Sequence, residues 1–250
     1  MVKGLELFRD FFQDYKEQYV LIGGAACDII FEDAAQEFRA TRDLDLVLIV
    51  EALTPEFGKI FWEFVNTGKY HNKSRSEGTP QFYRFDKPEV PEYPYMLELF
   101  SRQSFQLVGD TNVLTPMHIG DEISSLSAIL LNDVYYQMIL DGRMVIDGMV
   151  VLAPVYIVPF KAKAWLDLSE KRKNGLHVDS KDIKKHKNDV VRLVTLLSEN
   201  EDLILPDEVR IDMEFFIDGY EKEPADLKAL GILSMKNEDI ISRMRGIYLK

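Results

Sequence analysis

The chain has a single cysteine, Cys27, among its 250 residues, so it cannot form an intramolecular disulfide. Lack of disulfides is typical of proteins that fold in a reducing compartment. The N-terminal residues lack the apolar stretch of a signal peptide, and no apolar run approaches the roughly 20 residues that a membrane helix needs. We therefore expect a cytoplasmic protein with no membrane partner.

Positive charge is also scarce, because 30 lysines and arginines face 42 aspartates and glutamates, for a net charge of −12. A chain this acidic does not attract nucleic acid through its overall charge, so any RNA contact must use a local basic patch. Two dense basic clusters occur, Lys171–Lys173 and Lys181–Lys187. They could guide a tRNA-like acceptor, and a solvated helix face is the alternative interpretation.

Several motifs are absent, and each absence excludes a class of site. The four histidines lack the spacing of zinc ligands, so no zinc site is expected. The pair Gly23–Gly24 lacks the following Lys-Ser/Thr of a P-loop, and there is no Gly-x-Ser-x-Gly element of the α/β-hydrolases.

The N-terminal region contains an apolar run, a glycine pair and a helix-length segment in succession. Tyr19–Ile22 predicts a strand, Gly23–Gly24 a turn, and the residues from Ala25 to Phe38 a helix. A glycine turn ahead of a helix leaves backbone N–H groups available for a phosphate. We therefore expect Gly23 and Gly24 to donate hydrogen bonds to a phosphate.

Two carboxylates, Asp43 and Asp45, stand one residue apart at the start of a predicted strand that runs through Leu44 to Val50. Residues i and i+2 of a strand point to the same face, so the two aspartates project together. Adjacent carboxylates repel each other, and a divalent cation between them removes that repulsion. Oxygen ligands suit Mg²⁺.

A third carboxylate, Glu98, is the only charge in the apolar strand Tyr95–Phe100. A buried, unpaired carboxylate costs several kcal/mol, and a metal offsets that cost. The pattern therefore predicts a magnesium site made by Asp43, Asp45 and Glu98. The alternative is a solvated strand face for the aspartates and a strand edge for Glu98.

The remaining pattern predicts an α+β fold, with a mixed sheet flanked by helices in residues 1–153 and a helical domain in residues 154–250 that closes the cleft. A helix is expected to begin after Thr54-Pro55, where Thr54 is the N-cap, and to end near Gly68. The polar residues 71–78 predict a loop. The remaining expected elements are a strand over Gln81–Phe85, a hairpin of residues 134–140 and 144–152 around Asp141-Gly142, and helices over residues 155–171 and 180–198.

The order of glycine pair, helix, Asp-x-Asp and later strand Glu resembles the nucleotidyltransferase superfamily, which has the DNA-polymerase-beta-like fold. Within it, the chain looks most like the AbiEii-type toxin nucleotidyltransferases. The resemblance is carried by Gly23–Gly24, by Glu98 and by the segment Arg39-x-Thr41-x-Asp43-x-Asp45. It covers roughly residues 15–200.

The resemblance implies further site residues and cofactors. Pro159–Leu168 is similar to the helix that carries the nucleotide-contacting lysine, which implies that Lys161 or Lys163 neutralises the β- and γ-phosphates. Arg39 and Thr41 are implied as nucleotide-binding residues. The cofactor implied is Mg²⁺, with two ions in the site, or Mn²⁺ in its place.

The resemblance also implies an activity. We expect a metal-dependent transferase that moves a nucleoside monophosphate from an NTP to a hydroxyl of RNA (such as tRNA) or of a protein, with a small-molecule acceptor as the alternative. Its toxin-type role implies a cognate antitoxin as partner. The alternative is a non-catalytic nucleotide sensor or scaffold with the same fold, which is favoured by Gly24 at a position where many members have serine.

Overall fold

The computed structural model of the chain describes residues 2–74, 80–101, 107–108, 113–114 and 132–250. The chain divides into two compact units. The first comprises Met1–Glu122 and Gly142–Leu152, and the second comprises Ile123–Asp141 and Ala153–Lys250.

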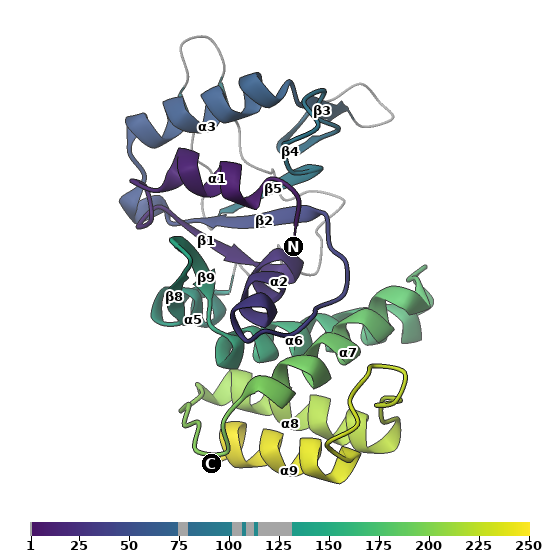
Figure 1. Cartoon of the computed structure of the whole chain (residues 1–250). Coiled ribbons are helices and arrows are strands. Elements are labelled where there is room, and N and C mark those ends of the chain that lie inside the picture. Colours follow the sequence, from purple (N-terminus) through teal and green to yellow (C-terminus); the bar gives the residue numbers. More distant parts are fainter. Residues whose placement is uncertain (1, 75–79, 102–106, 109–112, 115–131) are drawn as a thin grey trace. The chain divides into compact units, whose positions relative to one another are not determined.

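A mixed sheet forms the centre of the first unit, and Figure 1 labels its strands. In the described residues it has seven strands in the order β3-β4-β5-β2-β1-β9-β8. They are β1 (Tyr19–Ile22), β2 (Asp43–Leu48), β3 (His71–Ser74), β4 (Pro80–Asp86), β5 (Met96–Ser101), β8 (Arg143–Ile146) and β9 (Met149–Leu152). A separate short pair joins β6 (Leu107–Val108) to β7 (Val113–Leu114). The predicted α+β fold class is confirmed.

An aromatic core covers one face of this sheet. It is contributed by α1 (Leu5–Phe12) and α3 (Pro55–Gly68), which follows the short 3-10 helix η1 (Val50–Ala52). Phe8 of α1 packs edge-on against Tyr19 of β1 at 5.3 Å, and Phe61 of α3 packs against Phe85 of β4 at 5.6 Å. Since Tyr19 and Phe85 point to this face, the residues next to them in β1 and β4 point to the other one.

The start of α3 follows the predicted capping pattern. The hydroxyl of Thr54 accepts a hydrogen bond from the Phe57 N–H at 3.3 Å, and Pro55 occupies the first turn. The helix ends at Gly68, as expected. Local sequence was sufficient here because the cap and the helix are adjacent in the chain.

The hairpin prediction was wrong in its first half. Residues 134–140 belong to the helix α5 (Asp133–Asp141), because the Asn132 side chain accepts hydrogen bonds from the N–H groups of Val134 (2.8 Å) and Tyr135 (3.3 Å). The hairpin is β8–β9, and its turn is the second Asp-Gly pair, Asp147-Gly148, where φ is +45° and +79°. Positive φ at both central residues is the requirement of the type I′ turn, one of the two common two-residue hairpin turns.

The loop predicted for residues 71–78 was also wrong in part. His71–Ser74 forms β3, which pairs antiparallel with β4. Pairing with a neighbouring strand overrides the low strand propensity of a polar segment. Residues 75–78 lie outside the described residues.

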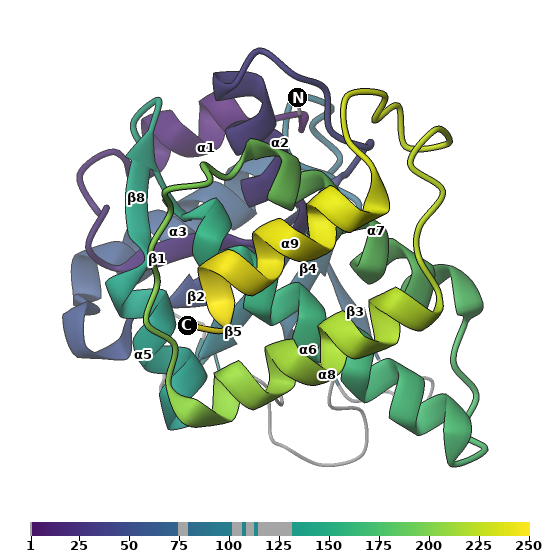
Figure 2. The ribbon, with the colours of Figure 1, turned by 90° about the horizontal axis from the view of Figure 1, so that it is seen from below.

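The secondary structure of the described residues of the second unit is helical. The helices are α5, α6 (Pro154–Lys173), α7 (Ser180–Leu196), α8 (Asp207–Lys222) and α9 (Asn237–Tyr248). Figures 1 and 2 both show α6 beside α7 and α8 beside α9. The helices predicted for residues 155–171 and 180–198 are therefore confirmed. Within the part of the chain that the structure describes, none of the helices combines the length and the apolarity needed to span a bilayer.

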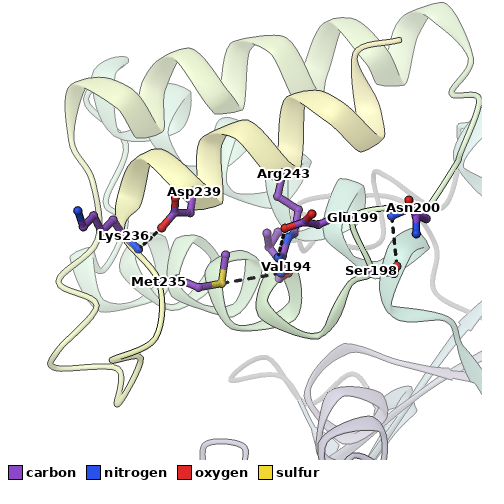
Figure 3. A network of polar contacts seen from close by, with 8 residues as sticks. All are labelled: Val194, Ser198, Glu199, Asn200, Met235, Lys236, Asp239 and Arg243. Carbon is purple, nitrogen blue, oxygen red and sulfur yellow. Dashed lines mark hydrogen bonds and ion pairs between the residues drawn. The ribbon is translucent and has the colours of Figure 1, made fainter.

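Polar contacts hold the last helix in place (Figure 3). The guanidinium group of Arg243 in α9 donates to the carbonyl of Val194 in α7 at 3.4 Å and to Glu199 at 3.2 Å. At the start of α9, the Asp239 carboxylate accepts a hydrogen bond from the Lys236 N–H at 2.8 Å. The C-terminal helix is thus capped at its start and bonded to α7 through Arg243.

Candidate functional site

The three predicted carboxylates lie on two neighbouring strands. β2 and β5 run parallel, and their register sets Asp45 opposite Glu98. Asp43 lies two residues before Asp45, so all three backbone positions direct their side chains to the same face of the sheet. Leu44 and Leu46 alternate with the aspartates and are fully buried on the opposite face. The strand period thus leaves the carboxylates on the face that the aromatic core does not cover.

The glycine turn lies against this face. The helix α2 (Gly23–Asp33) begins directly after β1, and Gly23 has φ +67°. A Cβ atom at Gly23 would overlap the carboxylate of Asp45, so the backbone of the turn and this carboxylate are in contact. Asp45 therefore brings negative charge to the N-terminal end of α2, where the helix dipole favours an anion.

Gly24, the second glycine of the turn, brings together two more predicted residues. A Cβ atom at Gly24 would lie 2.6 Å from the Thr41 hydroxyl oxygen and 3.7 Å from a guanidinium nitrogen of Arg39. The Thr41 side chain thus fills the space that a serine at position 24 would need. This packing explains the glycine at that position, and Thr41 supplies a hydroxyl beside the turn.

Arg84 of β4 is a site residue that the sequence analysis missed. It lies opposite Glu98 in the antiparallel β4–β5 pair, and its guanidinium group forms an ion pair with the Glu98 carboxylate. The Glu98 side chain is only 14% exposed, so this partner offsets most of the cost of burying the charge. Alternation with the buried Phe85 predicts which face Arg84 is on, but its partner depends on which strand lies beside β4.

A divalent cation fits this donor set only in part. Carboxylate oxygens on one face of adjacent strands are suitable ligands for Mg²⁺. However, among the residues that the structure describes, no three His, Cys, Asp or Glu side chains are gathered closely enough to hold a metal ion. Glu98 lies against Arg84 instead. Asp43 and Asp45 fit as a pair of ligands, and the three-carboxylate site remains a prediction.

Lys161 and Lys163 lie in the second unit, on α6, and each has a carboxylate partner there. Lys161 is 8% exposed, and its Nζ lies 3.0 Å from Asp189 of α7, whose side chain is fully buried. The Nζ of Lys163 lies 3.0 Å from Asp212 of α8 and 3.8 Å from Asp167. Both lysines therefore contribute to the packing of α6 against its neighbours.

The carboxylate of Asp212 also accepts a hydrogen bond from the Tyr135 hydroxyl at 2.8 Å. Burial raises the pKa of Tyr135 far above its usual value, and the charge of Asp212 raises it further. Burial also raises the pKa of Asp167, against the opposite effect of the Lys163 charge. Tyr135 is therefore a protonated donor throughout the physiological range, and Asp212 joins α5, α6 and α8.

No family model matches the chain, and no curated protein matches it. The solved structures that are similar to it include the following two. One is an antigenic nucleotidyltransferase-like protein from Paracoccidioides brasiliensis, with 17% identity over 91% of this chain and 93% of that one and a TM-score of 0.42. The other is JHP933 from Helicobacter pylori, with 13% identity over 96% of this chain and 87% of that one and a TM-score of 0.41. At these identities and TM-scores, neither likeness establishes a shared activity.

Proposed function

We propose that the chain is a nucleotidyltransferase that depends on a divalent cation and moves a nucleoside monophosphate from an NTP to an acceptor hydroxyl. The observation that carries the proposal is the strand register that sets Asp45 opposite Glu98, with Asp43 on the same face and the glycine turn against Asp45. Carboxylates for a cation and backbone donors for a phosphate thereby meet in one place.

Different residues of the first unit would bind the cation and the phosphates. Asp43 and Asp45 would hold the cation, which when bound neutralises phosphate charge and lowers the pKa of the acceptor hydroxyl. The N–H groups at Gly23 and Gly24 would donate to phosphate oxygens. The Thr41 hydroxyl, beside Gly24, is a further donor, and Arg39 adds positive charge.

In the transfer, the acceptor oxygen forms a bond to the α-phosphorus while the bond from that phosphorus to the bridging oxygen breaks, and pyrophosphate leaves. Glu98 accepts the hydroxyl proton as general base. This role requires the Glu98 carboxylate to leave Arg84, because the ion pair occupies the oxygen that would accept the proton.

The proposal keeps a lysine of α6 as a contact of the β- and γ-phosphates. Lys163 is the better candidate, since its side chain is 27% exposed and that of Lys161 only 8%. To contact a phosphate, either lysine would have to break its ion pair with a carboxylate of the second unit.

Transfer of label from each α-³²P-labelled NTP into total RNA and protein, with Mg²⁺ present, tests the activity. We expect label in one acceptor with wild type, and none with Asp43→Asn or Asp45→Asn. The matched control is Asp147→Asn, which removes an exposed carboxylate from the β8–β9 turn of the same unit and should leave transfer unchanged. Full activity of both aspartate variants would contradict the assignment.

The ion pair between Arg84 and Glu98 favours a second candidate function, a nucleotide sensor that binds without turnover. A general base occupied by an arginine suits binding better than proton transfer. Calorimetric titration with each NTP and Mg²⁺, run beside an assay of pyrophosphate release, distinguishes the two. Binding without release, with RNA and protein present, would favour the sensor.

The proposal includes the toxin role that the family resemblance implies, with RNA or a protein as acceptor and an antitoxin as partner. Induced expression in bacterial cells tests it. We expect growth arrest with wild type and normal growth with Asp45→Asn at equal protein levels. Normal growth with both would remove the toxin role and leave the transferase activity to be judged by the labelling assay.

A further inference from the structure

A basic pocket of about 850 Å³ lies within the second unit, between α6, α7 and α8. Six of its lining side chains are cationic and two carry carboxylates. The cations are Arg172, Lys173, Lys181, Lys184, Lys187 and Lys222. In a chain with a net charge of −12, this hollow is a local concentration of positive charge.

The two basic clusters of the sequence meet at this basic pocket. One comes from the C-terminal end of α6 and the other from the first half of α7, and α8 adds Lys222 in its last turn. Lys187 is buried and pairs with Glu223 at 3.3 Å. For the other five cations, the described part of the chain contains no ion-pair partner. Six cations beside only two carboxylates leave a net positive charge whose members repel one another, and a bound polyanion would remove that repulsion.

An aromatic ring forms part of the pocket wall. Trp165 is half-buried, and its ring lies on Gly219 of α8, where a Cβ atom would be only 2.6 Å from it. The ring also packs edge-on against Phe216 at 5.3 Å. The indole is therefore held in a fixed orientation beside the cations. A basic groove with a fixed aromatic ring is the arrangement that binds single-stranded nucleic acid, because the cations contact phosphates and the ring stacks on a base.

We propose that this basic pocket binds single-stranded nucleic acid, with several phosphates on the cations and one base against Trp165. Six cations on three helices exceed what the phosphates of one free nucleotide require, and they suit consecutive phosphates of a strand. An acidic peptide has no base to stack on Trp165. In a duplex the bases are stacked on one another and are not available to the ring. The proposal goes beyond nucleotidyl transfer, since the pocket binds a strand whether or not the chain transfers nucleotides.

Fluorescence anisotropy with the full chain tests binding, using a labelled RNA of about 12 nucleotides and the DNA of the same sequence, without NTP or divalent cation. We expect saturable binding of at least one strand, and the two arms show whether the 2′-hydroxyl contributes. The logarithm of the affinity should fall with the logarithm of salt concentration by about 0.7 per phosphate contacted. Absence of binding to both strands at about 50 mM salt would overturn the proposal.

Two neighbouring lysines of α7 provide a matched pair of variants. Lys184 lines the basic pocket, whereas Lys185 is exposed and does not line it. The two alanine variants change the net charge equally. We expect Lys184→Ala to weaken binding at least threefold and to reduce the salt slope by about 0.7, the value for one phosphate contact, with little effect from Lys185→Ala. An equal loss in the two variants would mean that binding follows overall charge, and would overturn the proposal.

The ring can be observed directly because the chain has only two tryptophans, Trp62 and Trp165. In a Trp62→Phe background, we expect the strand to quench the fluorescence of Trp165, and in the wild-type background we expect Trp165→Ala to weaken binding about tenfold. Circular dichroism checks that both variants are folded. Unchanged fluorescence at saturation, equally tight binding of a duplex, or equally effective competition by ATP would each overturn the proposal.

Discussion

The carboxylates of β2 and the lysines of α6 are charged groups on well-packed elements, but their charges are balanced in different ways. Asp43 and Asp45 lie on a sheet face that is partly exposed, and Asp45 contacts the N-terminal turn of α2. Lys161 lies inside a helical layer and has a fully buried carboxylate, that of Asp189, as its partner. A charged group that is partly exposed to solvent can bind a ligand, whereas a fully buried charged group needs its ion-pair partner to remain stable.

The largest effect is expected when the buried pair is broken. Asp189→Leu leaves the Lys161 ammonium buried without this carboxylate, which should lower the free energy of unfolding by about 3–5 kcal/mol. Urea unfolding measures the loss. Lys161→Met combined with Asp189→Leu should recover most of it, because no buried charge of this pair is left. By contrast, Asp45→Asn should cost less than about 1 kcal/mol. Similar losses for Asp189→Leu and Asp45→Asn would contradict the comparison.

The next largest effect is expected at the glycine turn. Gly23→Ala adds a Cβ atom at φ +67°, where it overlaps the Asp45 carboxylate. The substitution should therefore lower the free energy of unfolding by about 1–2 kcal/mol or more. Gly231→Ala is the matched control, because Gly231 has φ +77° and open space around it. Urea unfolding gives the loss in free energy of unfolding for each variant. The difference between the two losses measures the contact of position 23 with Asp45. Equal costs would mean that the carboxylate moves aside freely.

A substitution at Arg84 tests how strongly the sheet face that carries Asp43, Asp45 and Glu98 attracts a cation. Arg84→Gln removes the positive charge beside Glu98, so Mn²⁺ should bind about three- to tenfold more tightly. Titration followed by electron paramagnetic resonance, with no nucleotide present, measures the affinity. Arg9→Gln serves as control, since Arg9 pairs with Asp147 on the same unit and the change in net charge is equal. An equal gain in both variants would assign the effect to net charge.

The smallest effect is expected for the hydroxyl beside the turn. Gly24→Ser should cost about 1 kcal/mol because its side chain meets the Thr41 hydroxyl. In a Thr41→Ala background the serine has room, so the two changes should couple favourably by at least about 0.5 kcal/mol. A double-mutant cycle in urea measures this coupling. Strictly additive costs would show that Thr41 does not restrict position 24.

The local features of the fold were predicted well from the sequence. The Thr54 cap of α3 follows from a pattern of a few residues, and the α+β class follows from the order of the predicted strands and helices along the chain. The Asp-Gly pairs at 141–142 and 147–148 show where such patterns fail, since both are equally good turn signals. Asn132 caps a helix ahead of the first pair, and strand pairing makes the second one the hairpin turn. Arg84 was missed because its partner depends on strand order, which no local pattern contains.

The sequence by itself determined that Asp43 and Asp45 share one face, because the strand period is a property of the backbone. It also indicated that a helix starts close to the Gly23–Gly24 pair, although the structure begins α2 at Gly23 itself and not after the pair. Only the tertiary structure decided that Asp189 pairs with Lys161, that Arg84 pairs with Glu98, and that two basic clusters line one pocket. These partners are distant in the chain, and they meet only when packed helices and ordered strands bring them within reach of each other's charge.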